Sequence, residues 1–101
     1  MIKPTMRERK RYIRVRFEGA ELSEREATEV INAAVLEFLG ELGFSKLNPK
    51  LVEFKNNEAV ILCSHSEVQK LKAALALVDE IKGKTGCIRI LRVSGMMRKV
   101  M

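Results

Sequence analysis

The fold is decided by the stretch Gly86-Cys87-Ile88-Arg89-Ile90-Leu91-Arg92-Val93-Ser94-Gly95-Met96-Met97-Arg98-Lys99 near the end of the chain. Its first half is rich in β-branched and aliphatic residues and follows the turn glycines Gly83 and Gly86, which is typical of a β-strand. All charged side chains of the stretch are cationic, and it has no carboxylate. A half-buried strand that carries only positive charge needs an anion to face.

Working outward from this strand, three more strands are predicted. Residues 11–18 alternate between apolar and polar side chains, as in a half-buried strand with a cationic outer face. Residues 58–64 are almost wholly apolar, as in a central strand covered on both sides. Residues 50–55 form a shorter strand, joined to the apolar one by a tight turn at Asn56-Asn57.

The first helix is predicted from a capping box, in which a serine and a glutamate three positions later satisfy each other's backbone N–H groups. Ser23 and Glu26 occupy these positions, and the helix should run for about five turns. It should end near Gly40 or Gly43, with a loop over residues 44–49. The apolar stripe expected in the core is Ala27, Val30, Ile31, Ala34, Val35, Phe38, Leu39 and Leu42.

The second helix is predicted in the same way. Ser66-Glu67-Val68-Gln69 resembles a second capping box, and the helix should run from Glu67 to about Lys82. Its core stripe is Val68, Leu71, Ala74, Leu75, Val78 and Ile81.

The predicted order is strand, helix, strand, strand, helix, strand. This is the βαββαβ pattern of ferredoxin-like and RRM-like α+β sandwiches. It predicts an antiparallel sheet in the order 4-1-3-2 with two helices on one face. The first and last strands are then neighbours, so their arginines share a face or an edge. The first strand also separates Cys63 from Cys87, so we expect free thiols and no disulfide.

The charge of the chain is segregated. The net charge of +6 is divided into +6 for residues 1–16, −6 for residues 17–81 and +6 for residues 82–101. In the predicted topology a flexible basic arm (residues 1–10) and a basic tail (residues 95–101) leave the sheet at the same end and form one patch. Segregated charge of this kind indicates a polyanionic partner, and two solvated tails are the alternative.

Bulk properties narrow the class of protein. The length of 101 residues fits a single domain, 1–101, and a hydrophobic content of 47% fits a globular one. No apolar run approaches the roughly 18 residues of a membrane span. The N-terminus, Met-Ile-Lys-Pro, has no apolar signal core, so we expect a cytoplasmic protein.

No catalytic constellation is recognisable. His65 is the only histidine, and one histidine without cysteine or carboxylates at ligand spacing makes no metal site. Gly83-Lys84-Thr85-Gly86 lacks the spacing of a phosphate-binding P-loop. We therefore expect no catalytic residue, and no metal or cofactor bound by the protein itself.

The cationic side chains of the two ends of the chain favour RNA as the polyanionic partner. RNA recognition motifs share this topology and stack bases on aromatic side chains of their central strands. Residues 59–63 have no aromatic, and Tyr12 is the only candidate on the first strand. Phosphate contacts should therefore dominate, as in recognition of structured RNA by shape. The predicted RNA-binding residues are Arg9, Lys10, Arg11, Arg14, Arg16, Arg89, Arg92, Arg98 and Lys99.

The second helix is apolar beyond its core stripe. Ala73 and Leu77 widen the apolar arc on one flank, and Leu36 lies on the far side of the first helix. A helix of this kind is either deeply buried or covered by a partner. We predict that Leu36, Ala73 and Leu77 contact a partner protein.

Four segments in the same order resemble the archaeal ribonuclease P protein component 2 family. They are Arg9-Lys10-Arg11-Tyr12-Ile13, Asn48-Pro49-Lys50-Leu51-Val52-Glu53-Phe54, Leu71-Lys72-Ala73-Ala74-Leu75-Ala76-Leu77-Val78 and Leu91-Arg92-Val93-Ser94-Gly95. The resemblance covers nearly the whole chain. It departs after Gly95, where the family has a threonine and an aliphatic residue and this chain has Met96 and Met97.

The resemblance implies a subunit of ribonuclease P, the ribonucleoprotein endonuclease that removes the 5′ leader of precursor tRNA. In that hydrolase the RNA carries the chemistry with bound Mg²⁺, and the protein is non-catalytic by itself. The implied partners are the ribonuclease P RNA, protein component 3 and a second copy of the chain, in a two-plus-two heterotetramer. From the lack of a long apolar run, we expect no membrane partner.

Other classes remain open on the residues alone. One is a ferredoxin-like protein–protein interaction module with solvated tails, and another is a generic structured-RNA-binding protein. A free-standing hydrolase is a third, although no motif supports it.

Overall fold

The computed structural model describes residues 9–95. The predicted arm therefore falls outside it except for Arg9 and Lys10, and the predicted tail except for Gly95. The elements in chain order are β1 (Lys10–Glu18), α1 (Glu24–Leu47), β2 (Lys50–Lys55), β3 (Glu58–Ser64), a 3₁₀ turn (His65–Glu67), α2 (Val68–Ala76), β4 (Glu80–Ile81), β5 (Lys84–Thr85) and β6 (Cys87–Ser94).

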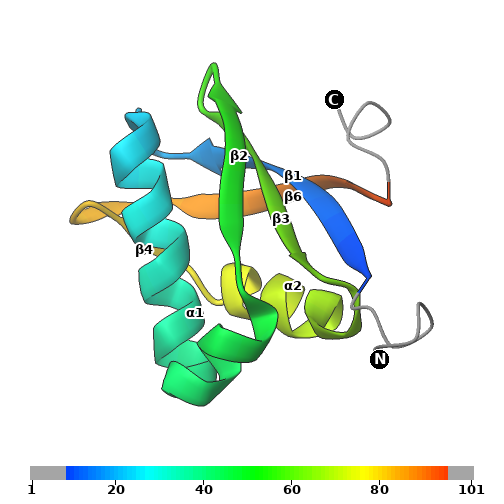
Figure 1. Cartoon of the computed structure of the whole chain (residues 1–101). Coiled ribbons are helices and arrows are strands. Elements are labelled where there is room, and N and C mark those ends of the chain that lie inside the picture. Colours follow the sequence, from blue (N-terminus) through cyan, green and yellow to red (C-terminus); the bar gives the residue numbers. More distant parts are fainter. Residues whose placement is uncertain (1–8, 96–101) are drawn as a thin grey trace, which may run out of the picture.

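The main sheet has four antiparallel strands in the order β2-β3-β1-β6 (Figure 1). With β6 as the fourth strand, this is the predicted order read from the opposite edge, so the ferredoxin-like prediction is confirmed. Strands β1 and β6 pair along their length, and β1 begins where β6 ends, with Tyr12 opposite Ser94. Strand β1 lies between the strands of Cys63 and Cys87, as expected. The β4–β5 hairpin was not predicted.

Both helices pack against one face of the sheet. Ile13, Val15 and Phe17 of β1 are buried there with Ile31 of α1 and Leu71 of α2, in a single hydrophobic cluster. Each such side chain contributes roughly 1.5–3 kcal/mol when it is fully buried. Because successive residues of a strand point to opposite faces, the side chains between them in β1 face away from the helices.

Two local signals have the predicted structure. The Ser23 hydroxyl accepts the N–H of Glu26 at 3.2 Å, and the Glu26 carboxylate accepts the N–H of Ser23 at 3.0 Å. That backbone hydrogen bond lowers the pKa of Glu26. Asn56 and Asn57 have positive φ of 53° and 62° in the β2–β3 turn. The Asn57 side chain also donates to the carbonyls of Phe17 and Ala20, both at 2.7 Å, and so ties the turn to the end of β1.

Helix α1 is longer than predicted. The backbone kinks at Gly40 (φ 75°, ψ −179°), and the helix then resumes and continues to Leu47. The prediction of a loop over residues 44–49 is therefore wrong. The prediction that Phe38 and Leu42 lie in the core is also wrong, because they are 44% and 73% exposed. The kink redirects the helix axis, so the residues that pack on the core beyond Val35 are Leu39, Phe44 and Leu47.

Helix α2 is shorter than predicted and ends at Ala76. The prediction of a second capping box is also wrong. Residues 65–67 form a 3₁₀ turn, and the N-cap residue Glu67 makes no side-chain capping bond. Ile81 is buried as expected, but it enters the core from strand β4. The chain reverses after it through Lys82 and Gly83, both with positive φ (54° and 79°).

None of the helices within residues 9–95 has the length and hydropathy of a membrane-spanning segment.

Candidate nucleic-acid interface

The sheet face that points away from the helices, called here the open face, carries most of the predicted RNA-binding residues that the structure describes. On it Arg14 lies opposite Arg92, and Arg16 lies opposite Arg89. The predicted juxtaposition of the arginines of the first and last strands is thus present. The open face consists of Lys10, Tyr12, Arg14, Arg16 and Glu18 of β1, Lys50, Glu53 and Lys55 of β2, Glu58, Val60 and Leu62 of β3, and Cys87, Arg89, Arg92 and Ser94 of β6.

A β-bulge brings Arg89 and Arg92 to the same face. They are three residues apart, so regular alternation would put them on opposite sides of the sheet. The pairing of β1 with β6 shifts between Arg14 and Val15, and Leu91 is the extra residue. A bulge of this kind re-aims the side chains that follow it. The pairing of β2 with β3 has a similar shift at Val52, which puts Lys50 and Glu53 on the open face together.

Glu58 links two of these arginines. Nε of Arg14 donates to Oε1 of Glu58 at 2.9 Å, and Nη2 of Arg14 donates to the same oxygen. Nε and Nη2 of Arg16 donate to Oε2 at 3.0 Å and 2.8 Å. The Glu58 side chain is only 16% exposed, whereas Arg16 is 46% exposed. One carboxylate therefore holds two guanidinium groups side by side.

A second ion pair lies beside this bridge, where β1 ends and β6 begins. Nε of Arg89 is 3.2 Å from Oε2 of Glu18, and its Nη2 donates to Oε1 at 3.3 Å. The Cys87 thiol also donates to Oε1 of Glu18, at 3.6 Å. Over the whole open face, seven cationic side chains stand against three carboxylates, a balance of +4. The face therefore remains cationic after its internal pairs are counted.

The remaining predicted RNA-binding residues lie elsewhere. Arg11 shares the alternation of the core residue Ile13, so it points away from the open face. Its Nη1 donates to the carbonyl of Lys10 at 3.0 Å, and its guanidinium lies beside Gly95, at the end of the sheet. The carbonyl of Arg9 accepts the N–H of His65 at 2.7 Å. Arg98 and Lys99 lie outside the described residues, and so do Met96 and Met97.

Other groups on or near the sheet offer little chemistry. Among the described residues of the open face, Tyr12 is the only aromatic side chain. Within residues 9–95 no group of three or more histidine, cysteine, aspartate or glutamate side chains is placed to hold a metal ion. Burial raises the pKa of the Cys63 thiol to about 11, so this thiol stays protonated at neutral pH.

The low pKa of Glu58 predicts an acid-dependent part of the stability. Hydrogen bonds from Arg16 and then Arg14 hold this pKa below its ordinary value of 4.5. The bridge therefore stabilises the fold fully above pH 4.5, and the contribution is lost as the pH falls through the folded-state pKa. In thermal denaturation at a series of pH values, the wild type should lose more stability in acid than Glu58→Gln, by at most about 1 kcal/mol. Identical pH profiles would contradict the bridge.

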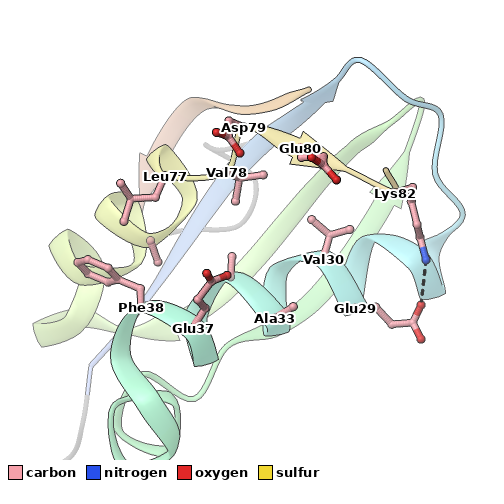
Figure 2. Close-up of a pocket in the computed structure, with 12 residues that line it drawn as sticks. Glu29, Val30, Ala33, Glu37, Phe38, Leu77, Val78, Asp79, Glu80 and Lys82 are labelled. Carbon is pink, nitrogen blue, oxygen red and sulfur yellow. Dashed lines mark hydrogen bonds and ion pairs between the residues drawn. The ribbon is translucent and has the colours of Figure 1, made fainter. Parts of the chain in front are cut away.

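A groove lies on the helical side of the molecule, between α1 and the segment from the end of α2 to Lys82 (Figure 2). Its volume is about 940 Å³. We call it the helix groove. Phe38 and Leu77 lie at one end, and Glu29 and Lys82, whose Nζ and Oε1 are 3.4 Å apart, lie at the other. The lining residues are Glu29, Val30, Ala33, Ala34, Glu37, Phe38, Ala74, Leu77, Val78, Asp79, Glu80 and Lys82.

The helix groove contains one of the three predicted partner-binding residues. Leu77 lines it and is 65% exposed. Ala73 and Leu36 are exposed but do not line it. Sequence reasoning missed Phe38, which it placed in the core. The signal was present, because the first helix has a wider apolar stripe than one sheet can cover.

Comparison with known proteins identifies the family. Residues 11–101 match the Rpp14/Pop5 family, which is described as RNase_P_Rpp14. The chain is 42% identical over 97 residues to ribonuclease P protein component 2 of Methanocaldococcus jannaschii, covering 95% of this chain and 72% of that one. It is 35% identical over 100 residues to the protein of the same name from Pyrococcus horikoshii, covering 96% and 83%.

A solved structure has the same fold. A chain in the cryo-EM structure of yeast ribonuclease MRP superposes with a TM-score of 0.72 at 17% identity, covering 92% of this chain and 78% of that one. The family match covers the helix groove and all of the open face except Lys10. The chain therefore belongs to the Rpp14/Pop5 family.

Proposed function

We propose that this protein is the component 2 subunit of ribonuclease P, and that its open face binds and stabilises the RNA of that particle. The particle removes the 5′ leader of precursor tRNA. The names of the relatives support the assignment to the particle. The observation that carries RNA binding is the gathering of Arg14, Arg16, Arg89 and Arg92 on one sheet face of net positive charge.

The mechanism is electrostatic. Arginine side chains on the open face contact phosphates and release condensed counterions, which stabilises the folded RNA. Arginine suits this task because its planar fork of N–H groups pairs with phosphate oxygens. The RNA carries the cleavage chemistry with its Mg²⁺, and the protein lowers the Mg²⁺ concentration that the folded RNA requires.

The helix groove is the proposed docking site for component 3. Its floor is apolar, and its rim has four carboxylates and one ammonium group, a balance of −3. Charge complementarity therefore favours a partner segment with apolar side chains flanked by lysine or arginine. We assign the groove to component 3 and not to a second copy, because a copy would present the same acidic rim. The two-plus-two assembly needs a separate contact between copies.

A matched pair of variants tests the open face. Arg92→Gln removes a cation from it, and Lys72→Gln removes one from α2, on the other side of the sheet. In titrations of ribonuclease P RNA at several salt concentrations, Arg92→Gln should reduce the slope of log affinity against log salt by about one unit. Lys72→Gln should leave the slope unchanged. In reconstituted cleavage of precursor tRNA, Arg92→Gln should raise the Mg²⁺ requirement.

Other outcomes identify the alternatives. A wild-type protein that does not bind the RNA at moderate salt would favour the protein–protein interaction module. Equal binding to unrelated structured RNAs, with no effect on reconstituted cleavage, would favour a generic RNA-binding protein. Cleavage of precursor tRNA by the purified protein alone would mean that it is a hydrolase.

A further inference from the structure

Glu58, the first residue of β3, is a carboxylate on the face that is proposed to bind a polyanion. It lies directly opposite Arg16 in the sheet, two residues from Val60, which is opposite Arg14. Its two oxygens each accept two N–H groups from one arginine. In both arginines the edge that carries Nε and Nη2 faces Glu58, so the Nη1 side of each guanidinium is directed away from the carboxylate.

The effect of Glu58 on net charge runs against the proposed function. A negative charge on the open face lowers its affinity for any polyanion. The fold gains little in return, because ion pairs with a solvent-accessible arginine contribute little to stability. The benefit that remains is geometric. Holding two long, flexible side chains in place before binding removes part of the entropy cost of ordering them on the ligand.

We propose that Glu58 is a positioning residue that presents the guanidinium groups of Arg14 and Arg16 as a fixed pair. This inference rests on the proposed function and adds selectivity to it. A fixed pair matches phosphates at one separation, as in folded RNA with a defined backbone. A flexible single strand gains less from the pair, because it adapts its backbone to any arrangement of cations.

The test compares two variants with the same change of charge on the same face. Glu58→Gln keeps the shape of the side chain, but its amide nitrogen cannot accept a hydrogen bond, so one arginine is released. Glu53→Gln removes a carboxylate from β2 of the open face and leaves the bridge intact. Each is titrated with in-vitro transcribed ribonuclease P RNA and with poly(U), and thermal denaturation verifies that each is folded.

A positioning role of Glu58 predicts that Glu58→Gln changes the affinity for poly(U) and the affinity for the folded RNA differently. Glu58→Gln should bind poly(U) as well as or better than the wild type but lose about tenfold in affinity for the folded RNA, the effect of one charge-assisted hydrogen bond. Glu53→Gln should bind both ligands at least as well as the wild type. Arg16→Lys keeps the net charge but not the forked contact, so it should also reduce the preference for folded RNA.

The outcomes separate this inference from the proposed function. If the wild type binds neither ligand, the proposed function fails. If the wild type binds the folded RNA and Glu58→Gln behaves like Glu53→Gln, the function stands and the positioning role is rejected. If Glu58→Gln does not fold, Arg16→Lys decides alone, and an unchanged preference for folded RNA rejects the role.

Discussion

Gly19→Ala should lower the free energy of unfolding by about 3 kcal/mol, because it combines a strained backbone with an overpacked contact. Gly19 has φ of +103°, a conformation that side chains rarely adopt. A Cβ built on it would lie 2.4 Å from the carbonyl oxygen of Thr85 and 2.6 Å from Cα of Gly86. These are backbone atoms, so relief requires the β4–β5 hairpin to move away from the end of β1. Denaturant unfolding, or a fall in Tm of about 15 °C, would measure the effect.

Gly83→Ala is the matched control. Gly83 also has positive φ, +79°, but nothing lies within 4 Å of a Cβ built there. It isolates the backbone penalty, which is about 1 kcal/mol. If Gly19→Ala costs no more than Gly83→Ala, the close approach of Gly19 to Thr85 and Gly86 is not the reason that position 19 requires a glycine.

The contact between Gly19 and the β4–β5 hairpin explains why the end of the second helix could not be predicted. Leu75, Val78 and Ile81 are spaced as on a helix, and the first strong breaker after them is Gly83. In the structure the N–H of Gly86 donates to the carbonyl of Asp79 at 3.1 Å, closing a hairpin that packs against Gly19. The helix competes with a tertiary contact more than 60 residues away along the chain, and local periodicity does not report such contacts.

Strands β2 and β3 were predicted with their observed bounds, and the reason is local. Asn56 and Asn57 fix the turn between them, and the apolar run of β3 has no competing helical period. The first capping box succeeded for the same reason. The second failed because Ser66 lies within a 3₁₀ turn, where its side chain does not cap the helix.

The open face shows what topology can and cannot predict. The strand order alone places the arginines of β1 and β6 side by side. It does not predict which of them share a face, because that depends on a bulge at Leu91. The spacing of Arg89 and Arg92 was a usable signal. Two charged residues three apart in a half-buried strand cannot both reach solvent unless the strand has a bulge. The link through Glu58 had no such signal, because it depends on the register of β3 against β1.

Leu77→Lys should weaken docking of component 3 by at least about thirtyfold, the effect of losing an apolar anchor residue from an interface. Leu77 is 65% exposed and lies across the helix groove from Phe38. The new ammonium group would remove an apolar contact and repel the cations that the acidic rim favours in the partner. Because Leu77 is solvent-exposed in the isolated chain, the fold should keep its stability. Isothermal titration calorimetry with purified component 3 measures the change.

Leu36→Lys is the control that distinguishes the groove from general surface hydrophobicity. Leu36 is 41% exposed on the same helical layer and was predicted to bind a partner, but it does not line the groove. The same change of charge there should alter the affinity for component 3 less than threefold, as expected for a contact outside the energetic centre. If Leu36→Lys weakens binding as much as Leu77→Lys does, the partner covers a broader surface of α1. If neither variant changes the affinity while the wild type binds, component 3 docks elsewhere, and the acidic rim must serve another ligand or none.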